Sequence, residues 1–130
     1  MEKRLFTVGE ANDLLPYLTE RMQHLKSLRR SLTRRAKKTA PSRDEITMRG
    51  GVPVGLAYFS QIRRLEKLVR EIGSHGCQMK DLDSGLVDFP TLWEGREVYL
   101  CWKLGEPEVA FWHELHTGFA GRQPLGEAPR

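Results

Sequence analysis

Residues 97–104 read EVYLCWKL, and this stretch decides the class of fold. Val98, Leu100 and Trp102 point to one face of a strand and the residues between them point to the other, a repeat of two that is typical of β-structure. Shorter alternating runs separated by glycine-containing turns precede and follow it. Four strands are expected, at about 77–82, 86–89, 97–104 and 108–115, with turns at 83–85, 94–95 and 105–107. The C-terminal half therefore predicts a small antiparallel β-meander of three to four strands within residues 76–116.

The N-terminal half instead repeats with the period of an α-helix. Thr7 and Glu10 have the spacing of a capping box, and apolar residues recur every three or four positions after it. A helix is expected over 7–38, kinked near Pro16, because proline lacks a backbone donor. A second apolar stripe predicts a helix over 55–73 that ends at Gly73. Proline and glycine punctuate the segment between them, so residues 39–54 are expected to form a loop.

These elements together predict one α+β domain over residues 1–130. Its 39% hydrophobic residues are enough for one core. The two helices are expected to pair as a long N-terminal antiparallel hairpin packed on the C-terminal meander, and residues 117–130 to form a tail. Neither an apolar run of about eighteen residues nor a leader sequence is apparent, so a cytoplasmic protein without membrane contact is expected. Cys77 and Cys101 lack the spacing of a zinc ribbon and are expected to be reduced, buried thiols.

Charge is divided unevenly along the chain. Residues 1–75 carry 16 Lys and Arg against 8 Asp and Glu, whereas residues 76–130 carry 5 against 9. A basic helix joined to an acidic sheet is therefore expected. Phosphate contacts from the first helix would give affinity for RNA that falls with salt. The candidate nucleic-acid contacts are Lys26, Arg29, Arg30, Arg34, Arg35, Lys37 and Lys38.

Polar and aromatic residues of the meander form the candidate ligand site. Carboxylates and imidazoles are common metal ligands and acid/base groups, and neighbouring strands could bring Asp88 or Asp83 close to His113. Of these, Asp88 and His113 are the candidate metal ligands, although no complete metal motif is present. A nucleophilic pair of Cys101 with His113 is a further alternative, set against inert packing of the cysteine. Nucleotide-binding motifs are absent, and the cofactor is left unassigned. The candidate site residues are Lys80, Asp81, Asp83, Asp88, Trp102, Glu106, Trp112, His113 and Arg122.

Several long motifs resemble a bacterial protein family. They are KDLDSGLVDFP at 80–90, VYLCW at 98–102, GEPE at 105–108, WHE at 112–114 and GFAGR at 118–122, together with FTV at 6–8. With them, nearly the whole chain resembles the family catalogued as domain of unknown function 2203. The resemblance implies kinship but no activity.

The leading hypothesis is therefore a non-enzymatic binding or protein-interaction module. Its helices would form a homodimer or contact another protein, because a long hairpin cannot cover its whole apolar face with a small sheet. The alternatives are a small metal-assisted or acid/base enzyme that uses the Asp/His cluster, and an RNA- or ribosome-associated protein that uses the basic helix.

Overall fold

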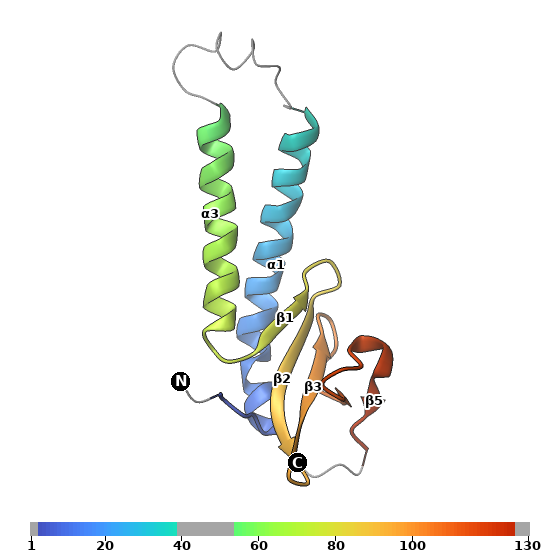
Figure 1. The fold of residues 1–130 in the computed structure, drawn as a ribbon. Coiled ribbons are helices and arrows are strands. Elements are labelled where there is room, and N and C mark those ends of the chain that lie inside the picture. The colour runs from blue at the N-terminus through green and yellow to red at the C-terminus, as the bar shows by residue number, and fades with distance from the viewer. Residues whose placement is uncertain (1–2, 39–53, 127–130) are drawn as a thin grey trace.

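The computed structural model describes residues 3–38 and 54–126 and has an α+β fold (Figure 1). Two antiparallel helices, α1 (Val8–Lys38) and α3 (Val54–Gly73), stand side by side, and a five-stranded sheet follows them. Both helices agree with the predicted ranges to within one residue. The loop predicted for 39–54 lies outside the described residues, apart from Val54, which begins α3.

The start of α1 is fixed by its cap. The backbone N–H of Glu10 donates to Thr7 Oγ1 over 3.1 Å, and the N–H of Thr7 donates to Glu10 Oε1 over 2.9 Å. These two bonds satisfy donors that a helix start otherwise leaves open. The helix then continues through Pro16 to Lys38 without a break.

The two helices meet along a seam of buried aliphatic side chains. Leu18, Met22 and Leu25 of α1 are fully buried, as is Ile72 of α3. The other half of α3 differs, because Leu56 and Phe59 are 61% and 62% exposed. The hairpin is thus well packed beside the sheet and leaves apolar surface open toward its far end.

The sheet is an antiparallel meander in the order β1-β2-β3-β4-β5. Its strands are β1 (Gln78–Asp81), β2 (Leu86–Trp93), β3 (Arg96–Lys103), β4 (Phe111–His113) and β5 (Gln123–Pro124). The prediction of three to four strands was wrong, because the expected tail returns to the sheet as β5. Leu125 anchors this return: its side chain is buried, and its N–H donates to the carbonyl of Ala110 over 2.9 Å.

β1 is one residue shorter at each end than predicted, and β2 and β4 differ more strongly in length. β2 runs past Phe89 to Trp93, because Pro90 lacks an N–H only on the side that does not face β3, so no hydrogen bond between β2 and β3 is lost. The Pro90 carbonyl accepts from the N–H of Phe6 over 2.7 Å, so this side of the residue faces the sheet edge. β4 is shorter than expected, because the N–H of Val109 donates to Asn12 Oδ1 over 2.7 Å instead of joining the ladder.

The hairpin turn between β2 and β3 sets the sheet register. Glu94 and Gly95 have φ values of 51° and 80°, the left-handed pair of a type I′ turn. Trp93 therefore pairs with Arg96, and the pairing continues without a slip to Leu86 opposite Lys103.

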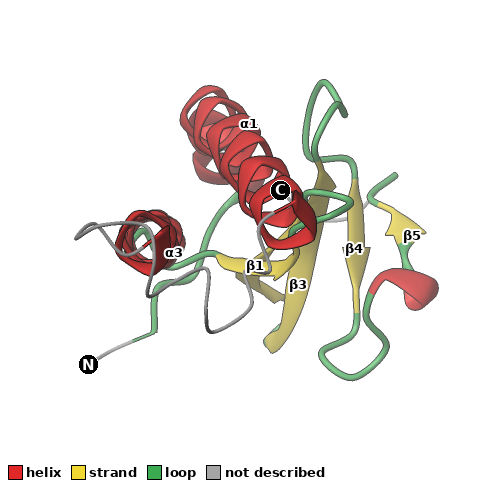
Figure 2. Cartoon of the chain, turned by 90° about the horizontal axis from the view of Figure 1, so that it is seen from above, coloured by secondary structure: helices red, strands yellow, loops and turns green. Residues whose placement is uncertain are grey.

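The two faces of the sheet have different roles. Val87, Phe89, Leu100 and Trp102 lie on one face and share a single hydrophobic cluster with α1 and α3. Figure 2 shows α1 beside β1 and β3, and the short 3-10 turn η1 (Phe119–Gly121) at the opposite end near β5. The candidate polar residues Asp88 and His113 belong to the other face, which the helices leave uncovered.

Candidate functional site

Three buried side chains capable of binding a metal meet on the sheet face away from the helices. Asp88 of β2, Cys101 of β3 and His113 of β4 are each no more than 1% exposed. Asp88 and Cys101 are direct cross-strand partners, and His113 lies one step along the same face, opposite Tyr99. We refer to Asp88, Cys101 and His113 as the buried triad.

Hydrogen bonds fix the imidazole of His113 at both nitrogens. Nδ1 lies 2.7 Å from the carbonyl oxygen of Glu114, and Nε2 lies 3.0 Å from Asp88 Oδ2. A carbonyl can only accept, so Nδ1 carries a proton and donates it. Nε2 is therefore the nitrogen that faces the Asp88 carboxylate and the rest of the triad, and it is the His113 atom that could bind a cation.

The other carboxylate oxygen of Asp88 is left without a partner. Oδ1 is buried and makes no hydrogen bond within the described part of the chain. An unsatisfied buried acceptor costs roughly 1–3 kcal/mol, and more when it is charged. Oδ1 thus has no hydrogen-bond partner among the described residues, although the Cys101 thiol beside it interacts with the Asp88 carboxylate.

Cys101 is a poor nucleophile in this environment. Burial raises the pKa of its thiol to about 12; the negative charge of Asp88 adds to this rise and Arg122 opposes it. Neither nitrogen of His113 is open to accept the thiol proton, because one donates to a carbonyl and the other faces Asp88. The geometry thus gives no support to a nucleophilic Cys101–His113 pair.

The same three residues form a compact set of donors for a transition metal. One ligand atom from each residue lies within 4.8 Å of the other two. In a tetrahedral zinc site, bonds of about 2.0–2.3 Å place the ligand atoms about 3.3–3.8 Å apart, so small side-chain movements would close the triad around an ion. The Nδ1–H bond to a backbone carbonyl is the arrangement that usually orients a metal-binding histidine.

Arg122 covers this part of the sheet from the C-terminal segment. Its guanidinium stacks on Phe111 and Phe119, with centroid distances of 4.0 and 5.0 Å. Nη2 donates to the Cys101 carbonyl over 3.3 Å and pairs with Glu106 Oε1. The guanidinium thus ties η1 to β3 next to the triad.

The remaining predicted site residues are dispersed. Lys80 lies over the ring of Tyr99 at 5.1 Å, on the same face as the triad. Asp81 accepts from the Ser84 hydroxyl over 2.6 Å, which shapes the β1–β2 turn and lowers the Asp81 pKa. Asp83 in this turn pairs with Arg29. The side chains of Asp81 and Asp83 are therefore engaged elsewhere.

The predicted tryptophans lie in the core and not on the polar face. Trp112 packs edge-on against Trp93 with ring centroids 4.1 Å apart, and Trp102 is 1% exposed. The Trp102 indole N–H donates to the Glu106 carbonyl over 3.0 Å, which satisfies its single donor. Both side chains therefore stabilise the fold on the opposite side of the sheet from the triad.

Four of the seven predicted nucleic-acid contacts line one cavity. Lys26, Arg29, Arg30 and Arg34 line a cavity of about 350 Å³ beside the β1–β2 turn. Arg35 is half-buried on α1 and has an interaction of its own. The side chains of Lys37 and Lys38 lie outside the described part of the structure.

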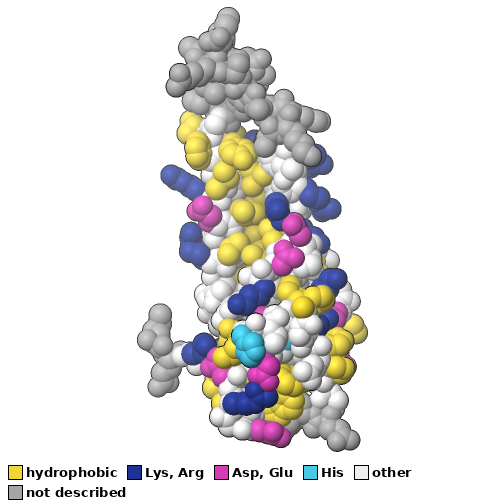
Figure 3. All heavy atoms as spheres, turned by 45° about the vertical axis from the view of Figure 1, so that its right-hand side comes forward, with side chains coloured by type: hydrophobic (Ala, Val, Ile, Leu, Met, Phe, Trp, Pro, Cys, Tyr) yellow, Lys and Arg dark blue, Asp and Glu magenta, His cyan; other side chains and the backbone are white. Residues whose placement is uncertain are grey.

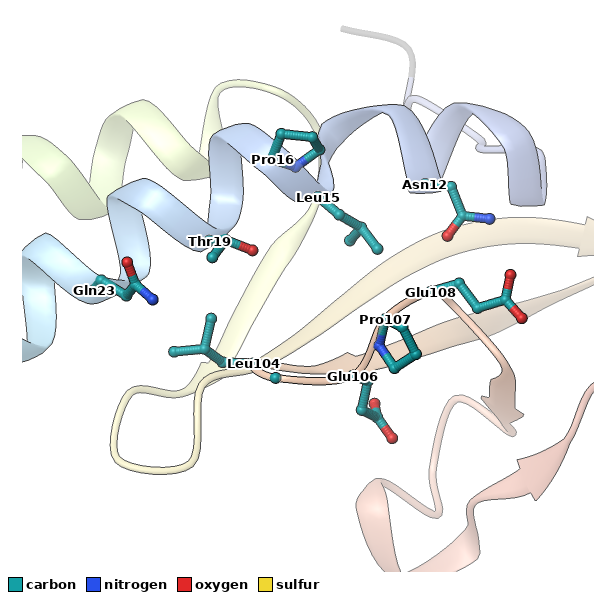
Figure 4. Close-up of a pocket in the computed structure, with 10 residues that line it drawn as sticks. Asn12, Leu15, Pro16, Thr19, Gln23, Leu104, Glu106, Pro107 and Glu108 are labelled. Carbon is teal, nitrogen blue, oxygen red and sulfur yellow. The ribbon is translucent and has the colours of Figure 1, made fainter.

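A larger groove of about 680 Å³ lies between α1 and the loop after β3 (Figure 4). Glu106 and Glu108 contribute to its wall, but Figure 4 shows both carboxylates pointing away from α1. Glu106 is also engaged with Arg122 and with the N–H of Lys103. Ligand sites need polar groups that converge, so the triad is the stronger candidate.

Comparison with known proteins gives a family and no activity. No curated protein matches the chain, and no solved structure matches it. The family model described as an uncharacterized conserved protein, DUF2203, matches residues 4–125. This match covers both helices and every strand, and so the chain belongs to the DUF2203 family.

Proposed function

We propose that this protein is a non-enzymatic binding module that holds a transition-metal ion, most favourably Zn²⁺, at the buried triad. The carrying observation is the convergence of Asp88, Cys101 and His113, with ligand atoms within 4.8 Å of one another and Asp88 Oδ1 unpartnered. Thiolate, imidazole and carboxylate together are a donor set suited to zinc.

Charge balance supports a divalent ion. With Cys101 as thiolate, Asp88 as carboxylate and His113 neutral, the ligands carry two negative charges that Zn²⁺ neutralises. Without the ion, the thiol keeps its proton, because burial raises the pKa of Cys101 to about 12. Binding at neutral pH should therefore release the thiol proton of Cys101.

Burial favours a binding role over catalysis. Three protein ligands leave a fourth coordination position on zinc, and in a catalytic site that position is open to water or substrate. The triad side chains are closed to solvent, and Arg122 packs beside them. Asp81 and Asp83 also lie away from the triad, so the small acid/base enzyme is the less favoured proposal. We place the protein in a reducing compartment such as the cytoplasm, where Cys101 would stay available to a metal.

A cobalt titration tests the proposal, with the second thiol as an internal control. Co²⁺ added to metal-free protein should give the absorption of a thiolate–cobalt bond. Cys101→Ser should abolish this absorption, whereas Cys77→Ser should leave it unchanged. Cys77 is equally buried, but its thiol donates to the Ile72 carbonyl over 3.4 Å and lies outside the triad. Absorption that persists in Cys101→Ser, or never appears in the wild type, would refute the proposal.

Thermal unfolding provides an independent test of metal binding. Zn²⁺ at 100 times its dissociation constant should stabilise the folded state by about 2.7 kcal/mol, provided the unfolded chain does not bind it. For a domain of this size that corresponds to a rise in Tm of roughly 10 °C. His113→Gln should abolish the rise, and His116→Gln, at an exposed position outside the triad, should retain it.

Self-association through the helices is a second proposed property. Leu56 and Phe59 are more than half exposed on α3 and, with Arg63, line an open depression. Figure 3 shows apolar side chains gathered along the hairpin, with Lys and Arg at its margins. An exposed patch of this kind is typical of an interface. A second copy of the chain could cover both apolar stripes at once, as in a four-helix bundle.

Light scattering during size exclusion would test the dimer. Leu56→Ser with Phe59→Ser should convert it to a monomer. Leu92→Ser with Leu115→Ser is the matched control, because these leucines are 59% and 47% exposed but lie on the sheet side of the molecule. A wild-type monomer at high concentration, or equal effects of the two double variants, would contradict the proposed interface.

A further inference from the structure

The cavity between α1 and the β1–β2 turn is strongly basic. It measures about 350 Å³ and is lined by four cationic side chains of α1, together with Thr33 and two residues of the turn, Leu82 and Asp83. Asp83 pairs with Arg29 and occupies that guanidinium. Lys26, Arg30 and Arg34 have no acidic partner among the described residues. The cavity therefore presents three uncompensated positive charges.

These three cations follow one another along a single helix face. They are four residues apart, so each lies about 6 Å further along the axis of α1 than the one before it. Like charges at this spacing destabilise a helix. Residues 21–43 contain no Asp or Glu that would relieve the repulsion from within the segment. A polyanion would relieve it, and a row of evenly spaced cations matches a row of evenly spaced phosphates better than it matches one isolated anion.

We infer that this cavity binds the phosphate backbone of single-stranded RNA through Lys26, Arg30 and Arg34, without preference for base sequence. The described residues that line the cavity include no aromatic side chain on which bases could stack, so backbone contacts are expected to dominate. Thr33 adds a neutral hydroxyl donor between the cations. The large exposed apolar side chains of the hairpin, Leu56 and Phe59, lie on α3, away from this lining, so the cavity itself does not resemble a membrane-inserting surface.

Salt dependence gives the expected size of the effect. Three phosphate contacts on a single strand give a slope of about −2 for the logarithm of the binding constant against the logarithm of salt concentration. Affinity should then fall about 20-fold between roughly 50 and 200 mM salt. The measurement is the fluorescence anisotropy of a labelled oligouridylate titrated with the full chain.

Matched charge variants separate a site from general attraction. Lys26→Ala, Arg30→Ala and Arg34→Ala combined should abolish binding. Arg64→Ala, Lys67→Ala and Arg70→Ala combined remove the same charge from exposed positions of α3 and should reduce affinity by less than about threefold. Circular dichroism of both variants checks that the helices remain.

Asp83→Asn offers a gain of function at the rim of the same cavity. It removes the acidic group that holds Arg29, so affinity should rise and the salt slope should steepen by about 0.7. Three results would overturn the inference: no binding by the wild type at low salt, equal losses in the two triple variants, or unchanged affinity in Asp83→Asn. Binding of inorganic phosphate with equal affinity would also overturn it, because a single anion would then suffice.

Discussion

Asp88→Ala should lower the free energy of unfolding by about 3–5 kcal/mol, measured in the presence of EDTA so that no metal contributes. The carboxylate and the imidazole of His113 are both at most 2% exposed and lie 3.0 Å apart. Removing one member of a buried pair leaves the other without compensation, and this loss has the stated size. A domain of 130 residues is stable by only about 5–15 kcal/mol, so the change should be easily resolved.

Urea unfolding followed by tryptophan fluorescence is the appropriate assay, because Trp102 and Trp112 are buried in the native state. Asp83→Ala is the matched control: it also removes an aspartate from an ion pair, but Asp83 and its partner Arg29 are exposed. Surface pairs contribute at most about 1 kcal/mol. If Asp88→Ala destabilises the protein no more than Asp83→Ala does, the buried pair does not stabilise the fold as argued.

Three further perturbations test local features by the same assay. Gly85→Ala and Gly95→Ala both place alanine at positive φ, which should lower the free energy of unfolding by about 1–2 kcal/mol. At Gly85 the new Cβ would also lie 2.5 Å from the Cβ of Leu104, so we expect a further loss of about 1–3 kcal/mol there. Thr7→Ala removes the cap of α1 and should cost about 1 kcal/mol. Burial raises the pKa of the Cys77 thiol from 9.0 to about 11, so as pH rises the unfolded chain loses this proton before the folded chain does. The free energy of unfolding should therefore fall between about pH 9 and pH 11, and Cys77→Ala should lessen that fall.

The sequence predicted the helices closely and the sheet less well, for physical reasons. Local sequence patterns predict α1 and α3, namely a capping box, a helical apolar period and a terminal glycine. β5 consists of only Gln123 and Pro124, too short to show alternation. It forms because Leu125 finds a buried position, which depends on residues far away in the sequence.

The buried triad shows which part of a site can be predicted from the sequence. The meander predicted that Asp88 or Asp83 would lie close to His113; Asp88 Oδ2 lies 3.0 Å from His113 Nε2, whereas Asp83 pairs with Arg29. The candidate site predicted from the sequence lacks Cys101, although counting back from the two-residue turn at 94–95 places this residue opposite Asp88. The register of β4 against β3 could not be predicted from the sequence. The irregular segment before β4 ends where the N–H of Val109 donates to Asn12 of α1, a contact between residues far apart in the chain.

The two open edges of the sheet also restrict how copies of this protein can associate. At one edge, β1 is only four residues long, carries Lys80 and Asp81, and has an irregular register between Met79 and Asp81. At the other edge, β5 has two residues, and one of them is Pro124. Short, charged, irregular or proline-containing edges resist edge-to-edge aggregation. Continuation of the sheet from one molecule into the next is thereby disfavoured, which is consistent with the proposal that copies associate through the outer half of α3.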